Sequence, residues 1–393
     1  MKKLWFVASI SLSLLTGCWD RTEVNDLAIV TMAAIDKGKN DNVLLSVQIF
    51  VPRALGGGGT GSGGDGSGGK LTMVQSSEGV NMADAMSKLQ TKISRQIFWG
   101  HCKVYMFGEA VARKGVADHI DYLVRHPEPR NRANLFVSRG DAVDMLKLTP
   151  VLERSTAETL REIADLHIGM SVTLVDFRNM LRGEGEAVVL PVIENGKRLG
   201  GKEGKEVQNV LAGTAVFKRD KMVGLIPPTP TRGLLWLRDE ISRAAITVRI
   251  KNTEGVVSVT PIRMKARLTP RIENGKWSML VKVDTEGNVV ENGTRLNLLK
   301  PEWLAQVQQA VGEDIDHRIK MALHILQDEL KADVVNFAAA FHRNYPQEWE
   351  DAQKRWDEIF PKIEVNTHIN VDIRRPGLIS IPAGIPQSEV KDH

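Results

Sequence analysis

Cysteine is scarce in this 393-residue chain, which contains only Cys18 and Cys102. Two cysteines allow one disulfide at most, whereas small exported domains often depend on several. If the Cys18 thiol carries a lipid, as its sequence context predicts, Cys102 has no cysteine partner inside the chain. We therefore expect packed hydrophobic cores, rather than disulfides, to stabilise this protein.

Long hydrophobic runs are also missing beyond Cys18. A helix that spans a bilayer needs ~20 consecutive, mainly apolar residues, and no later segment provides them. The sequence therefore predicts no transmembrane helix.

An excess of one charge is absent as well. The formal net charge is +4, and it falls to +2 if Lys2 and Lys3 are removed with a signal peptide. Neither value indicates a nucleic-acid partner. With 25% charged and 42% hydrophobic residues the composition is that of a globular protein, and the length is sufficient for two or three domains.

The first eighteen residues are the most informative segment. Lys2 and Lys3 precede an apolar run, Leu4 to Leu15, which is followed by Thr16, Gly17 and Cys18. A charged start, a short apolar core and small residues are typical of a secretory signal peptide, here residues 1–17. A cysteine directly after Gly17 matches a bacterial lipobox, which predicts cleavage after Gly17 and a diacylglyceryl group on the Cys18 thiol. The alternative is an ordinary signal with a coincidental cysteine.

The next part, residues 18–204, is predicted to be an α+β region of two subdomains. Alternating apolar residues from Val43 to Val51 predict a strand with one buried face. A tract at 56–69, almost pure glycine and serine, is typical of a flexible loop within one domain. Further strands are expected at 104–107 and 135–137, and helices at 81–94, 115–124, 142–146 and 155–170. Residues 27–35 are mostly apolar and β-branched, and an apolar segment at 188–193 interrupts a turn-rich stretch.

Beyond a boundary placed at Gly200 to Gly204, residues 205–376 are predicted to form a C-terminal α+β domain, followed by a tail at 377–393. Strands are expected at 210–217, 246–250, 256–259, 262–268 and 277–283, with a closing strand at 365–373. Apolar residues at steps of three and four from Leu304 to Phe341 predict one long helix with a bend near Gly312. The expected fold is thus an elongated, multi-domain α+β structure with mixed sheets and packed helices.

No sequence motif supports nucleotide or metal binding. Gly61 to Gly66 matches G-x-G-x-x-G only because the tract is so rich in glycine, and a P-loop at Gly64 to Lys70 lacks the Ser or Thr that holds magnesium, since Leu71 follows. His101, Cys102, His119 and His126 show no ligand spacing. We expect no cofactor and no metal.

Catalysis is not indicated either. Glu184 and Glu186 flank Gly185 in a turn, which does not provide the shaped, dry site that general acid–base chemistry needs. No G-x-S-x-G elbow is present. We expect a protein that is not an enzyme.

Tryptophans and arginines admit two interpretations each. Trp303, Trp349 and Trp356 have helical spacing that favours core packing, although tryptophan is also common at partner interfaces. A basic strand face is predicted to be solvated or, alternatively, to contact anionic lipid head groups. Its residues are Arg263, Lys265 and Arg267, with Arg374 and Arg375 nearby. The alternating residues of the same segment, Ile262, Met264, Ala266 and Leu268, are predicted to face the core.

Several segments together resemble the Ger(x)C family of spore germination lipoproteins. They include C18-WDRTEVNDLA-28, G100-HCKV-104, Y122-LVRHPE-128 and G213-TAVFK-218. T231-RGLLW-236, N344-YP-346 with Trp349 and Trp356, and I373-RRPG-377 match as well. The resemblance covers nearly the whole chain after the signal.

This resemblance implies a non-enzymatic C subunit of a nutrient germinant receptor, lipid-anchored through Cys18 on the outer face of the inner membrane of the spore. Its expected partners are membrane-embedded A and B subunits and the lipid bilayer, and its expected role is receptor assembly or signal transmission. The implied fold is an elongated α+β structure of about three domains.

Two alternatives stay open. One is a solute-binding lipoprotein that captures a nutrient directly, although such proteins usually repeat βαβ units around a cleft. The other is a cell-wall hydrolase.

Overall fold

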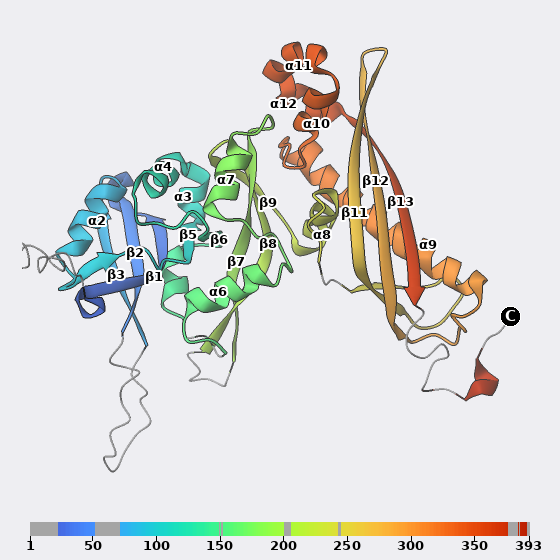
Figure 1. The fold of residues 1–393 in the computed structure, drawn as a ribbon, viewed down its shortest axis with the longest axis horizontal. Helices are drawn as coiled ribbons and strands as arrows, with labels where there is room; N and C mark the ends of the chain where they lie inside the picture. Colours follow the sequence, from blue (N-terminus) through green and yellow to red (C-terminus); the bar gives the residue numbers. More distant parts are fainter. Residues whose placement is uncertain are drawn as a thin grey trace, which may run out of the picture.

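The computed structural model describes residues 23–51, 71–148, 150, 152–199, 206–242, 245–375, 384 and 386–390. These residues form two β-sheets that lie side by side along the long axis, each with its own helices (Figure 1). The predicted mixed sheets with packed helices are confirmed. No helix among the described residues is long and apolar enough to cross a membrane.

The first sheet has nine strands in the order β3-β2-β1-β5-β6-β7-β8-β9, with β4 beside β1. Its central strands are parallel, and antiparallel hairpins flank them on both sides. The strands are β1 (Leu27–Lys37), β2 (Val43–Phe50), β3 (Thr72–Gly79), β4 (Gln96–Phe98), β5 (Val104–Gly108), β6 (Asn134–Ser138), β7 (Ala187–Leu199), β8 (Glu206–Lys218) and β9 (Lys221–Ile226).

Both faces of this sheet are buried, because successive side chains of a strand point to opposite sides. Val30 and Ile35 of β1 pack on one side, and Met32 and Ala34 pack on the other. Helices α2 (Met82–Gln90), α3 (Glu109–Lys114), α4 (Ala117–Arg125) and α7 (Leu174–Leu181) cover the first side. Helices α5 (Ala142–Leu146) and α6 (Thr156–Asp165) cover the second.

Local sequence explains where these helices begin and end. The side chains of Asn81 and Ser155 accept hydrogen bonds from backbone amides of the first turns of α2 and α6, and Thr173 forms a reciprocal capping box with Asp176. Helix α4 ends at Arg125, before Pro127. These caps satisfy amides that lack partners within the helices.

The glycine tract at 56–69 lies outside the described residues. The strands before and after it, β2 and β3, pair with each other in antiparallel register from Val43 opposite Gly79 to Phe50 opposite Thr72. The tract therefore connects two adjacent strands of one sheet.

The predicted boundary at Gly200 to Gly204 also lies outside the described residues. Strands β7 and β8 on either side of it are paired over most of their length, and β9 follows β8 in the same sheet. The two sheets consequently separate only after β9, because hairpin pairing holds residues 206–226 in the first sheet.

The second sheet has the order β10-β11-β12-β13, with β13 parallel to β12 and the other pairs antiparallel. Its strands are β10 (Ile246–Val248), β11 (Val257–Glu273), β12 (Lys276–Asn292) and β13 (Glu364–Arg375). The segments expected at 256–259 and 262–268 form one strand, β11. A bulge between Pro261 and Arg263 leaves Ile262 56% exposed, which corrects its predicted place in the core.

Helix α9 (Pro301–His324) packs on β13 and begins with proline in its first turn. It runs through Gly312 without a break, so the predicted bend there is wrong. The break comes later, after a π-helical turn at Ile325–Glu329, where Lys331 and Asn336 adopt left-handed conformations before α10 (Phe337–Asn344).

Asp333 explains the position of this break. Its buried carboxylate accepts hydrogen bonds from the amides of Phe337 (3.0 Å) and Ala338 (2.6 Å) and from the indole N–H of Trp356 (3.1 Å). The carboxylate thus caps α10 and ties it to α12 (Trp356–Ile359), which follows α11 (Pro346–Ala352). An aromatic cluster of Trp277, Phe341, Trp349, Trp356 and Phe360 surrounds this region.

Helix α8 (Pro228–Leu237) lies between the two sheets and packs closely on α9 (Figure 1). A Cβ atom at Gly233 would lie 1.9 Å from the carbonyl oxygen of Arg318. Only glycine allows this approach, so the contact between the two halves depends on its missing side chain.

Candidate functional site

The two residues predicted to carry the anchor, Gly17 and Cys18, lie outside the described residues. The motifs Gly61 to Gly66 and Gly64 to Lys70 lie outside them too. The lipid attachment and signal cleavage stay predictions.

The candidate metal ligands of the sequence do not assemble. Cys102 is fully buried, its thiol donates to the carbonyl of Val104 at 3.4 Å, and burial raises the pKa of the thiol to about 12. His101 contacts the ring of Phe98, whereas His119 lies near Phe107 and His126 near Tyr122. Within the described ranges, no group of three or more His, Cys, Asp or Glu residues is arranged to hold a metal ion.

The carboxylates of Glu184 and Glu186 have separate partners. Glu184 lies 2.9 Å from Nδ1 of His342, and this hydrogen bond holds the pKa of Glu184 below its usual value. Glu186 pairs with Arg219 at 2.7 Å. They do not face each other across a site.

The tryptophans lie mainly in the core. Trp349 and Trp356 are 4% and 5% exposed within the aromatic cluster, and Trp303 is half-buried against the same core. Their helical spacing is explained by packing.

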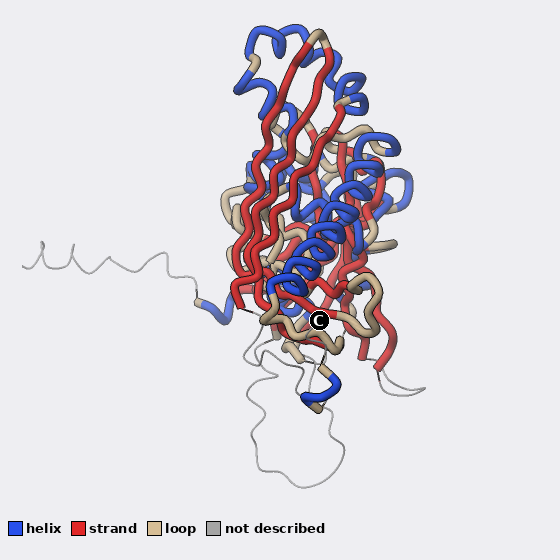
Figure 2. Tube along the Cα trace, turned by 90° about the vertical axis from the view of Figure 1, so that its right-hand side faces the viewer, coloured by secondary structure: helices blue, strands red, loops and turns tan. Residues whose placement is uncertain are grey.

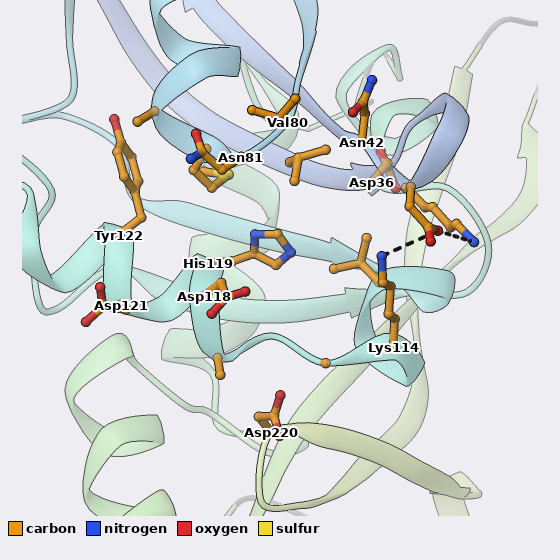
Figure 3. Close-up of a pocket in the computed structure, with 18 of the residues that line it drawn as sticks. Asp36, Asn42, Val80, Asn81, Lys114, Asp118, His119, Asp121, Tyr122 and Asp220 are labelled. Carbon is orange, nitrogen blue, oxygen red and sulfur yellow. Dashed lines mark ion pairs between the residues drawn. The ribbon is translucent and has the colours of Figure 1, made fainter.

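The best-formed hollow in the described structure is a pocket of about 540 Å³ in the first half (Figure 3). The turn between β1 and β2, the start of α2, helices α3 and α4, and Asp220 between β8 and β9 form its walls. Its lining mixes polar and apolar surface, with side chains of both charges. Sequence reasoning missed this site because its residues come from five separate segments.

Most charges at the pocket rim are neutralised within the protein. Asp41 forms ion pairs with Lys37 (2.9 Å) and Lys114 (3.4 Å), as Figure 3 shows, and the Lys37 hydrogen bond is the main reason that the pKa of Asp41 is lowered. Arg125 pairs with Asp121 at 2.8 Å. His119 faces the hollow from α4 (Figure 3), and burial lowers the pKa of its imidazole.

Asp36, at the inner end of the pocket, is a structural carboxylate. Its two oxygens accept hydrogen bonds from the amides of Ala142 (2.7 Å) and Val143 (2.8 Å) at the start of α5. Burial nevertheless raises the pKa of Asp36 to about 6, because the amides only partly offset the desolvation of the charge.

An Asp36→Asn variant tests this assignment. The folded pKa of about 6 exceeds the unfolded value of 3.8, so the folded chain binds more protons between these values and the stability contributed by Asp36 falls as pH rises through this window. We expect the variant to be less stable than the wild type at about pH 4, and the gap to shrink by up to ~3 kcal/mol by about pH 7. Urea unfolding at several pH values measures this gap. Asp118→Asn, at the exposed rim, is the control. If the stability difference between Asp36→Asn and the wild type changed with pH no more than that of the control, the assignment would be contradicted.

The junction between the halves is the second feature with functional potential. Helix α8 packs on α9 here, and two polar contacts lie nearby. Nη1 of Arg238 donates a hydrogen bond to the carbonyl of Val334 at 2.6 Å, and Lys218 forms an ion pair with Asp357 at 2.8 Å. Together with Glu184 and His342, these contacts connect the first sheet to the helices of the second. The junction therefore joins the halves through packing and polar contacts from several elements.

The predicted basic strand face is exposed but balanced by acids. Arg267 pairs with Asp284 at 2.9 Å, Lys265 with Asp239 at 3.6 Å and Arg374 with Glu286 at 2.6 Å. Met264, Ala266 and Leu268 on the other side pack half-buried against the core, as predicted. A contact of the basic face with anionic lipid stays a prediction.

Comparison with known proteins decides the family. Residues 20–195 match the family of the spore germination protein N-terminal domain, and residues 212–377 match the family described as spore germination B3/GerAC like, C-terminal. The chain belongs to the GerAC-like spore germination proteins. The resemblance to the Ger(x)C family found in the sequence is thereby confirmed, and so is an association with germination and sporulation.

GerAC-like relatives match almost end to end. The chain is 33% identical to the putative spore germination protein YfkR of Bacillus subtilis (strain 168), over 93% of this chain and 94% of that protein. It is 27% identical to spore germination protein KC of the same organism, over 95% of each. The crystal structure of the GerBC protein has the same fold, with a TM-score of 0.57 at 19% identity, covering 87% of this chain and 96% of that one.

Proposed function

We propose that this protein is the lipid-anchored C subunit of a nutrient germinant receptor, on the outer face of the inner membrane of the spore, and that it serves receptor assembly or signal transmission. The observation that carries the proposal is the family match over both halves of the chain. The proposed partners are the membrane-embedded A and B subunits and the bilayer itself.

The proposed anchor would keep the protein close to the membrane. Cys18 precedes the first strand, which begins at Leu27, by nine residues. An extended chain of that length reaches at most ~32 Å. Two acyl chains hold a protein stably in a bilayer, and confinement there raises its effective concentration near membrane partners.

The junction supports a role in transmitting or holding a conformation. Because Gly233 lets α8 pack directly on α9, a displacement of one half would move the other with it. Close-packed contacts transmit strain better than a flexible linker would. A subunit built this way can hold partners at both ends in a defined arrangement.

Crosslinking in intact spore membranes tests the proposal. A photoreactive group on exposed positions of the full chain should capture a permease-like B subunit or an A subunit, identified by mass spectrometry. Recovery of neither, from membranes that contain both, would count against receptor membership.

One observation favours the second candidate, a solute-binding lipoprotein. The pocket of about 540 Å³ is large enough for a small nutrient. The pocket lies within the first half rather than in a cleft between two lobes, which is unlike the usual design. Calorimetric titration of the full chain with candidate germinants distinguishes the two. Saturable binding that Asp118→Asn and His119→Ala abolish would favour the second candidate.

A further inference from the structure

Several loops of the first half meet where its parallel strands begin. Strands β1, β4, β5 and β6 are parallel, so the segments that precede them share one end of the sheet. The amide of Trp99 donates to the carboxylate of Glu128 at 3.1 Å, which joins the loop before β5 to the loop before β6. The amide of Lys103 bonds to the carbonyl of Thr31 in β1 at 3.0 Å. These loops therefore form one continuous surface.

This surface carries basic side chains without acidic partners. We call them the basic end, which consists of Lys92, Arg95, Lys103, Arg130 and Arg132. Within the described ranges none of the five forms an ion pair, and Lys92 donates to the carbonyl of Ser76 at 2.7 Å. Lys92, Arg130 and Arg132 are exposed, and the other two are half-buried. Their positive charge is therefore available to a partner.

Three carboxylates at the same end reduce this charge without cancelling it. Glu23 and Asp26 are exposed just before β1, whereas Glu128 is half-buried and accepts the amide of Trp99. Arg130 and Arg132 lie on either side of Asn131 in the loop before β6. The loop before β6 is consequently the most positive part of the surface.

The basic strand face of the second sheet differs in this respect. Arg267, Lys265 and Arg374 of that face each pair with a carboxylate. An anionic partner would have to compete with these acids. The second sheet, whose long strands and helix α9 are in front in Figure 2, lies at the opposite end of the long axis from β1 (Figure 1). The two basic surfaces are thus far apart and can be tested separately.

The proposed lipid anchor would bring the basic end to the membrane. Cys18 precedes Glu23 by five residues, which span at most ~18 Å. The short helix at Val24–Asp26 leads into β1, and Leu27 of β1 pairs with Gln96, the residue after Arg95. Attraction between exposed charges fades over ~8 Å at physiological ionic strength, so only a surface held close to the bilayer benefits from it.

We propose that the basic end binds the head groups of anionic phospholipids and turns the starts of β1, β4, β5 and β6 toward the bilayer. This orientation rests on the proposed function, because the acyl chains on Cys18 hold the surface close to the lipid. The five cations come from three loops, and this spread suits the many phosphates of a membrane surface better than one small ligand.

Vesicle binding without acyl groups tests the basic end separately from the anchor. The mature chain with Cys18→Ser, produced without residues 1–17, should sediment with vesicles of equal phosphatidylglycerol and phosphatidylcholine. Binding should weaken as the salt concentration rises, and vesicles of phosphatidylcholine alone should bind little. Equal binding to both kinds of vesicle, or to neither, would overturn the proposal and leave the receptor function unaffected.

A double substitution locates the surface. Each basic residue close to an anionic membrane contributes about fivefold to binding, so Arg130→Ala with Arg132→Ala should weaken vesicle binding on the order of tenfold. The matched control is Lys265→Ala with Arg267→Ala, which removes the same charge from the second sheet and should change binding little. All four side chains are exposed, so circular dichroism should show an unchanged fold. An equal or larger loss in the control would overturn the proposal.

Fluorescence quenching measures the orientation of the lipidated chain. A fluorophore on Asn131→Cys should be quenched by nitroxide-labelled head groups, whereas one on Asn370→Cys, exposed on the second sheet, should not. Cys102 is buried and will not take the label. Equal quenching at both positions, or quenching at Asn370→Cys alone, would overturn the proposal. If mass spectrometry showed Cys18 unmodified, the anchor would fail, and the vesicle measurement would still decide whether the basic end binds lipid.

Discussion

Replacing Asp333 with alanine is expected to lower the free energy of unfolding by about 3–5 kcal/mol. The carboxylate is 4% exposed and accepts hydrogen bonds from three backbone amides, those of Val335, Phe337 and Ala338, and from the indole of Trp356. Alanine would leave these donors buried without an acceptor. Burial raises the pKa of Asp333, and these same hydrogen bonds oppose that rise.

The effect should spread beyond the cap of α10. Trp356 packs against Trp277, Phe341 and Trp349, so loss of its hydrogen bond would loosen the aromatic cluster. Denaturant unfolding followed by tryptophan fluorescence measures both the stability and the order of the cluster. Asp333→Asn, which keeps one acceptor oxygen, should lose less than Asp333→Ala.

The control for this experiment is Asp328→Ala, in the π-helical turn five residues earlier. Its carboxylate is exposed and pairs with His324 at 2.6 Å. Exposed pairs of this kind contribute about 0–1 kcal/mol. If Asp333→Ala were as stable as this control, the buried carboxylate would not be what determines the break between α9 and α10.

Replacing Cys18 with alanine is expected to move the protein almost entirely from the membrane fraction to the aqueous fraction and to impair nutrient germination. Each buried methylene of an acyl chain contributes ~0.8 kcal/mol to membrane binding, so the loss of two chains removes nearly all of the attachment. Among the described residues no helix could span a membrane and replace it. Fractionation of spore membranes, with mass spectrometry of the N-terminal peptide, provides the measurement.

The chain offers a matched control in its other cysteine. Cys102→Ala alters a buried side chain two residues before β5 and leaves the predicted lipobox intact. It should fractionate with the membrane as the wild type does. Unchanged membrane association of Cys18→Ala would defeat the anchoring proposal, whereas its release without any loss of germination would separate the anchor from receptor function.

Local patterns in the sequence were sufficient for most elements of the fold. Alternation from Val43 to Val51 corresponds to β2, and Pro301 and Pro346 open α9 and α11. The helix expected at 115–124 corresponds to α4, which ends before Pro127, and the closing strand expected at 365–373 corresponds to β13. These features follow from side-chain periodicity and from the steric limits of proline, which act within a few residues.

Two errors share one cause. A bend was predicted at Gly312, but α9 continues through this position and packs on Ile369 and Val371 of β13 at ordinary contact distances. The helix instead breaks before Asp333, whose carboxylate accepts a hydrogen bond from the amide of Ala338 in α10. Ile262 looked like a core residue by alternation, but a bulge in the pairing with β12 turns it outward. In each case a contact with another element decided between local alternatives.

By itself, the sequence determined the family, the α+β class, the predicted lipobox at Cys18 and the order of most strands and helices, because these depend on composition and short-range periodicity. Only the tertiary structure decided that the first sheet continues through β9, that Asp36 caps a helix 106 residues away, and that β13 pairs in parallel with β12 at the end of the second sheet. Such features depend on which distant segments pack together, and that choice is made by the burial of shared surfaces, which a linear pattern does not record.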